Sequence, residues 1–210
     1  MDDGSLAATR RALHAVAELV LAGPQYRRCR DIRLRVTPGG FGTVTGPDVR
    51  LDGVELVTAG ARLPIGGRTC AELATAAGFE ASTLDDVYHD GPHVPAGEVL
   101  DPDPAAAAWL ARCWAAGDDA LRRLAPAETP ILWPEHFDIG IRVAETNYGV
   151  SPGDGHVAVP YAYVGPAVLP AGPFWNQPFG AARPMHELDD AAPDAVLAFF
   201  TEARRILAPF

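Results

Sequence analysis

Residues 31–57 read DIRLRVTPGGFGTVTGPDVRLDGVELV, and this stretch decides the class of fold. Apolar and arginine side chains alternate in its first seven residues, as in a strand with one buried and one solvated face. Gly39-Gly40 allows a tight turn, and Asp52-Gly53 between two apolar runs is a strong hairpin signal. The stretch therefore predicts an antiparallel meander, which a short edge strand at 63–65 extends.

Helical patterns surround this meander. The first pattern ends at Gly23-Pro24, because these residue types commonly terminate helices. A second begins at a capping box, in which Thr69 and Glu72 satisfy each other's backbone N–H groups. Asp103-Pro104 has the N-cap and first-turn residues of a long helix. We expect four helices, at residues 5–22, 70–77, 103–124 and 193–207.

The second half of the chain contains fewer regular patterns. A strand is expected over 131–143, with Pro134 interrupting its start, and another over 157–164. Residues 147–155 contain Asx residues and glycines, which favour a loop. We therefore expect a single α+β domain over residues 1–210, with a largely antiparallel sheet and helices packed on it. The order of elements also allows a duplicated α-β-β-α unit, with halves at about 5–80 and 103–210.

Composition excludes several functions. The chain of 210 residues has 17 basic side chains, all of them arginine, and 27 acidic ones, for a net charge of −10. Without lysine there is no Schiff-base chemistry, pyridoxal-phosphate attachment or Walker-A site, so no cofactor is expected. The acidic charge argues against nucleic acid or an anionic membrane as a partner.

The sequence also suggests a location. No apolar run is long enough for a transmembrane helix, and the acidic start Met1–Gly4 is unlike a secretory signal. Cys29, Cys70 and Cys113 are widely spaced, which fits small buried side chains better than disulfides or a metal site. We expect a cytoplasmic protein without a bound metal.

Polar and aromatic residues concentrate between Trp133 and Phe179. This window contains two of the four tryptophans and three of the five tyrosines. Its only basic residue other than histidine is Arg142, against four acidic ones, so a neutral or cationic ligand is expected there. The residues expected to line a ligand pocket are Asn147, Tyr148, Asp154, Tyr161, Tyr163, Trp175 and Asn176.

His136 and Asp138 are the candidate catalytic residues. Residues two apart on a strand point to the same face, so an aspartate could orient the histidine as a general base. A metal site would need a third ligand, for which Asp154 and His156 are the candidates. The alternative is structural, with Asp138 capping a turn or pairing with an arginine and His136 filling a polar gap.

The chain also resembles a family of uncharacterised bacterial proteins from high-GC genomes. The similarity lies in the run LWPEHFDI at 132–139, the run YAYVGP at 161–166, and Phe174-Trp175. A helical run beginning at Asp194 and the first predicted helix and strand are similar too. The resemblance implies an organisation of elements but no chemistry, because the family has no known function.

Two functions are therefore open. The first is a cytoplasmic protein that binds a small ligand in a pocket lined by residues 133–179, with acid–base chemistry at His136 if it is an enzyme. The second is a non-catalytic interaction module or homodimer, in which the same aromatic residues form an interface. Composition cannot separate these two, because aromatic residues are enriched in pockets and in interfaces.

Overall fold

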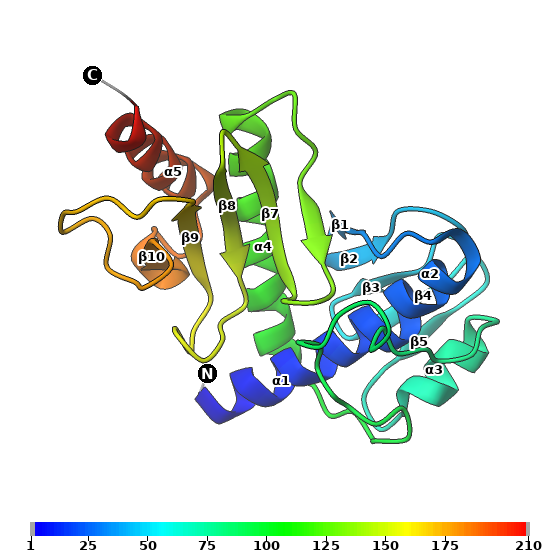
Figure 1. Ribbon diagram of the computed structural model, residues 1–210. Coiled ribbons are helices and arrows are strands. Elements are labelled where there is room, and N and C mark those ends of the chain that lie inside the picture. Colours follow the sequence, from blue (N-terminus) through cyan, green and yellow to red (C-terminus); the bar gives the residue numbers. More distant parts are fainter. Residues whose placement is uncertain (1–2, 209–210) are drawn as a thin grey trace. The chain divides into compact units, whose positions relative to one another are not determined.

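The computed structural model describes residues 3–208, so Met1 and Asp2 of the acidic start lie outside the described residues (Figure 1). The expected α+β class with antiparallel strands and packed helices is confirmed. The chain divides into two compact units, which are described separately. Unit 1 comprises residues up to Ala111 together with 132–137, and unit 2 comprises 112–131 together with residues from Asp138 onward. The single domain and the duplicated α-β-β-α plan stay predictions.

Unit 1 contains the antiparallel meander in the strand order β6-β1-β2-β3-β4-β5. Its turn residues behave as the sequence predicts, since Gly53 has a φ of 60° in the turn between β3 and β4. Pro64 lies in β5, at the edge of this sheet, where a missing N–H costs no ladder bond. The strands are β1 (Leu34–Thr37), β2 (Gly40–Thr43), β3 (Arg50–Asp52), β4 (Glu55–Val57), β5 (Arg62–Pro64) and β6 (Ile131–Trp133).

The first helix does not end at Gly23-Pro24, as the sequence predicts. It runs through α1 (Asp3–Ala15), a π-helix η1 (Val16–Ala22) and α2 (Gly23–Cys29). All seven residues of η1 are buried, and this segment packs on β1, β2 and α3 (Cys70–Ala76). The capping box of α3 is confirmed, with both reciprocal bonds between Thr69 and Glu72.

A loop residue explains how the helix passes through Gly23-Pro24. The Gly23 N–H donates to the carbonyl of Glu18, five residues back, as in a π-helix. Pro24 has no N–H, and the Leu19 carbonyl, five residues before it, instead accepts from the N–H of Ser82 at 3.0 Å. The backbone of Ser82 comes so close that a Cβ on Gly23 would lie 1.8 Å from its oxygen. Tertiary contact therefore replaces the bond that would otherwise be missing.

Unit 2 has the antiparallel strand order β10-β9-β8-β7. Helices cover one face of these strands, where Gly117 of α4 contacts Ile139 and Val150, and Tyr148 packs edge-on against Phe200 of α5 (Figure 1). The elements are α4 (Pro104–Leu124, whose first residues belong to unit 1), β7 (Asp138–Val143), β8 (Thr146–Ser151), β9 (Tyr161–Pro166), β10 (Ala181–Pro184), the 3-10 helix η2 (Met185–Glu187) and α5 (Pro193–Leu207). The predicted bounds of α5 are confirmed, and α4 begins at Pro104 after the N-cap Asp103, as predicted, with the Asp103 carboxylate accepting from the N–H of Ala106.

One prediction for unit 2 is wrong. Residues 147–151 are not part of a loop, because 146–151 form β8 and pair with β7 on one side and β9 on the other, whereas 152–155 have no regular structure, as predicted. Gly149 is tolerated inside this strand because the ring of Tyr163 lies over it and leaves no room for a side chain. The local pattern suggests that Gly149 lies in a turn, but the glycine is needed because Tyr163 packs against the strand at this position.

Candidate functional site

The strand geometry predicted for His136 and Asp138 is wrong. Residues 134–137 form a turn, and Phe137 has a φ of 56°, so the two-residue alternation of a strand does not extend back to His136. The His136 side chain is 61% exposed, with Nε2 4.0 Å from the Glu135 carboxylate. Asp138 is buried and accepts a hydrogen bond from Tyr163. The catalytic role of His136 and Asp138 stays a prediction, without the geometry that suggested it.

The turn is held by contacts in the core of unit 1. Phe137 is fully buried, with its ring stacked on His14 at 4.9 Å and edge-on against Phe41 at 5.3 Å. His14 Nε2 lies 2.6 Å from the carbonyl of Pro134. Burial lowers the pKa of His14 to about 4, so this histidine is neutral at pH 7 and can donate to that carbonyl. A remote helix therefore decides the shape of the segment.

Two tyrosines of β9 face two carboxylates in unit 2. Tyr163 lies over Gly140 and Gly149 and donates its hydroxyl to Asp138. Tyr161 donates to Asp154 at 2.5 Å, and Asp154 also accepts from the N–H groups of His156 and Val157. Burial and the neighbouring carboxylates raise the pKa of both tyrosines, so they remain protonated donors. These carboxylates are already occupied as hydrogen-bond acceptors within the protein, which favours a structural role.

The other predicted pocket residues do not form one group. Asn147 is exposed on β8, whereas Tyr148, its neighbour, is buried on the opposite face against Phe200. Asn176 bonds both backbone groups of Ala182 and so fastens its loop to β10. Trp175 packs edge-on against Phe174 at 5.0 Å. The structure thus places Asp138, Asp154, Tyr161 and Tyr163 in hydrogen-bonded pairs and gives the remaining residues other roles.

The bond between Tyr163 and Asp138 can be tested by substitution. Tyr163→Phe is expected to lower the free energy of unfolding by about 2 kcal/mol, because the buried carboxyl of Asp138 loses the hydroxyl donor of Tyr163. Denaturant unfolding measures this loss. Tyr26→Phe, at a partly exposed position on α2, is the matched control and should change stability by less than about 0.5 kcal/mol. Equal effects of the two variants would contradict the assignment.

A cavity of about 220 Å³ lies in unit 1, outside the 133–179 window. Its apolar wall comes from buried residues of η1 and the start of α2, and its rim from the end of α2, the segment after β2, and Phe79. No sequence motif marks these residues, because they meet only in the folded chain. The lining residues are Val20, Leu21, Pro24, Gln25, Arg28, Cys29, Thr43, Thr45, Gly46, Pro47 and Phe79.

Hydrogen bonds hold the polar part of this cavity in place. The Gln25 amide donates to the carbonyls of Asp31 and Arg33 and accepts from the N–H groups of Val44 and Thr45, all at 2.8–3.0 Å. The Thr43 hydroxyl donates to a carbonyl and accepts from Val49. A buried amide that makes all four of its bonds is a rigid anchor, so the cavity is largely pre-formed.

Cys29 corrects the expectation that all three cysteines are buried. It is exposed at the cavity rim, with Sγ 3.0 Å from the Gln25 carbonyl and 2.9 Å from the Thr45 hydroxyl. Cys70 and Cys113 are buried, and desolvation raises the pKa of Cys70 to about 12 and that of Cys113 further. Cys29 is therefore the thiol that reagents reach first.

Comparison with protein-family models finds no match, and no curated protein and no solved structure matches the chain. The resemblance to an uncharacterised bacterial family stays a prediction. Among the described side chains, no three His, Cys, Asp or Glu residues gather as a metal site would require. In the same described part of the chain, no helix is both long and apolar enough to cross a membrane.

Proposed function

We propose that this protein binds a small organic molecule in the cavity of unit 1. The cavity of about 220 Å³ is the observation that carries the proposal. It is smaller than the roughly 300–1,000 Å³ of sites for drug-sized ligands, so it suits a compact molecule. The proposed site lies in another part of the chain than the 133–179 window in which the sequence predicts a ligand pocket.

Two features support a binding role for this cavity. Its wall includes Val20 and Leu21 of η1, and π-helical segments are frequent at functional sites. An apolar wall beside a few fixed polar groups is the usual composition of a ligand site. The hydrogen-bonded Gln25 keeps this arrangement rigid, which lowers the entropy cost of binding.

Cys29 provides a direct test of occupancy. A ligand in the cavity should slow the reaction of Cys29 with iodoacetamide, and the slowing should saturate with ligand concentration. Two pairs of matched probes are used: phenylacetate with 2-phenylethanol, and hexanoate with hexan-1-ol. Mass spectrometry measures the rate of modification at Cys29.

The controls separate protection from indirect effects. In a Cys29→Ser variant, labelling should nearly vanish, because Cys70 and Cys113 are buried thiols with raised pKa values. The amide signals of Thr45 and Phe79 should shift with the same concentration dependence as the protection. The proposal fails if none of the four probes protects Cys29 and none shifts these signals.

We also infer a reducing, cytoplasmic compartment. The support is that Cys29, Cys70 and Cys113 are all free thiols, as is usual where disulfides do not form. The alternative function, an interaction module or homodimer built on the aromatic residues of 133–179, stays a prediction.

A further inference from the structure

The polar groups at the cavity of unit 1 differ in how many partners they already have. The Gln25 amide makes four hydrogen bonds, and the Thr43 hydroxyl both donates and accepts. The Cys29 thiol donates to a carbonyl and contacts the hydroxyl of Thr45. A ligand therefore finds few free groups on these residues.

Arg28 is the exception at this rim. Its neighbour Arg27 forms an ion pair with Asp86 at 2.7 Å, and Arg33 forms one with Asp31 at 2.7 Å. Among the side chains that the structure describes, residues 4–208, no acidic one forms an ion pair with Arg28. Its guanidinium lies over the Phe79 ring, 5.8 Å from the centroid. The cavity thus has a positioned cation with N–H donors to spare.

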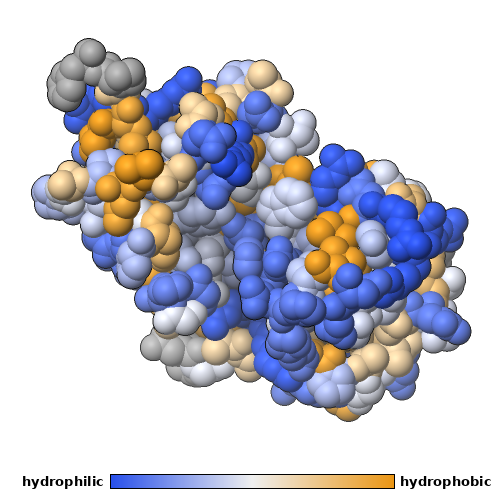
Figure 2. Space-filling model, viewed as in Figure 1, coloured by the Kyte–Doolittle hydropathy of each residue, from blue (hydrophilic) through white to orange (hydrophobic). Residues whose placement is uncertain are grey.

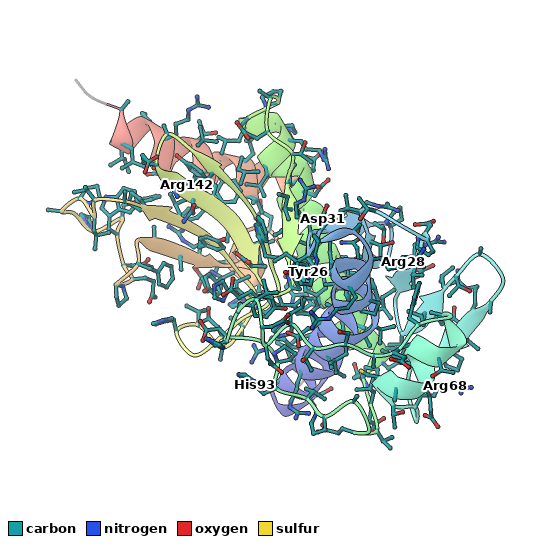
Figure 3. All side chains as sticks on the ribbon, turned by 45° about the vertical axis from the view of Figure 1, so that its right-hand side comes forward. Tyr26, Arg28, Asp31, Arg68, His93 and Arg142 are labelled. Atoms are coloured by element: carbon teal, nitrogen blue, oxygen red, sulfur yellow. The ribbon has the colours of Figure 1, made fainter. Side chains whose placement is uncertain are left out.

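The surroundings of Arg28 also favour a role for its guanidinium in binding a ligand. Tyr26 and Arg28 lie on different sides of α2, so Arg28 is directed away from the ring that Arg27 and Arg30 contact (Figure 3). Figure 2 shows many hydrophilic residues on the visible face of unit 1 around a small hydrophobic patch. The chain as a whole has a net charge of −10. Arg28 therefore gives this apolar cavity a local preference for anionic ligands, although the protein as a whole is acidic.

We propose that the ligand of this cavity is a small monocarboxylate with an apolar tail. The tail lies against Val20, Leu21 and Pro24, and the carboxylate accepts hydrogen bonds from Arg28. A planar guanidinium is the side chain best suited to a carboxylate, because two parallel N–H groups match its two oxygens. This inference rests on the proposed function, and it reverses the charge preference expected for the 133–179 window, which lies elsewhere in the chain.

The test compares each acid with its alcohol. Amide-shift titration should show phenylacetate and hexanoate binding about tenfold more tightly than 2-phenylethanol and hexan-1-ol, the effect of one charge-assisted hydrogen bond. The affinity of the acids should fall as salt is added, because the exposed guanidinium is screened. The affinity of the alcohols should not change with salt.

Variants of α2 make the test specific. Arg28→Gln should weaken the acids about tenfold and leave the alcohols within about twofold, and Arg28→Lys should restore part of the loss. Arg30→Gln is the matched control, since it removes the same charge from the end of α2 at a residue that does not line the cavity. Equal binding of acids and alcohols, or acid binding that Arg28→Gln leaves unchanged, overturns the carboxylate inference while the proposed function stands. Failure of all four probes to bind overturns both.

Discussion

Replacing Gly23 with alanine is expected to lower the free energy of unfolding by about 3 kcal/mol, the upper end of what overpacking costs. The new Cβ would lie 1.8 Å from the backbone oxygen of Ser82 and 3.0 Å from the Glu18 carbonyl. These are backbone atoms, which cannot rotate away as a side-chain end can. The segment at Ser82 must move, and its N–H then loses the carbonyl of Leu19.

The result is informative because alanine is normally the better helix residue. In a free helix, Gly→Ala stabilises by about 1 kcal/mol, so the tertiary clash must outweigh this gain. Denaturant unfolding measures the change, and Gly97→Ala is the matched control, because nothing lies within 4 Å of a Cβ at that position. If Gly23→Ala is as stable as the original chain, then the close contact between Ser82 and the helix does not exist.

Lowering the pH from 6.5 to 4 is expected to remove roughly 3 kcal/mol of stability through His14 alone. Burial lowers the pKa of His14 from 6.5 to about 4 in the folded protein. In that interval His14 becomes protonated in the unfolded chain but stays largely neutral in the folded protein. The unfolded state is therefore stabilised relative to the folded state as the pH falls. Above pH 6.5 both states are neutral, and the contribution of His14 no longer changes.

A variant isolates this contribution from other groups. Burial raises the pKa of Glu18, which therefore favours the folded state as the pH falls and acts in the opposite direction. The stability of the original chain and of His14→Gln is compared at each pH, and the difference between them should shrink by roughly 3 kcal/mol towards pH 4. His89→Gln, at an exposed histidine, is the control and should follow the original chain. A constant difference for His14→Gln would refute the assignment.

The elements that the sequence predicted well depend on residues close together in the chain. The meander of β1–β5 follows from alternation and glycine turns, and α3 follows from the capping box of Thr69 and Glu72. The last helix agrees with its prediction at both ends, because Pro193 begins it and its apolar stripe continues to Leu207. In each case the deciding interaction spans only a few residues.

The candidate site was predictable in part. The sequence predicts Asp138 as a catalytic residue and Tyr161, Tyr163 and Asp154 as ligand-binding residues, and the structure joins the four in two tyrosine–carboxylate pairs. The sequence could not predict that these carboxylates accept hydrogen bonds from tyrosines. Whether a carboxylate has such a partner depends on which strand pairs beside it. The cavity was not predicted at all, since Phe79 and Arg28 meet across about 50 residues of sequence.

The sequence by itself determined the α+β class, the antiparallel hairpins and the helix ends that local caps specify, because those choices rest on backbone preferences and on neighbours in the chain. Only the tertiary structure decided where the first helix ends, how residues 134–137 turn, and which residues line the cavity of unit 1. Each of these features depends on a contact between residues far apart in the chain. The Ser82 N–H donates to the Leu19 carbonyl, the His14 ring stacks on Phe137, and the Arg28 guanidinium lies over the Phe79 ring. When a backbone group or side chain can adopt two arrangements, contact with a distant segment selects one of them. A local sequence pattern does not include that distant segment, so it cannot predict the choice.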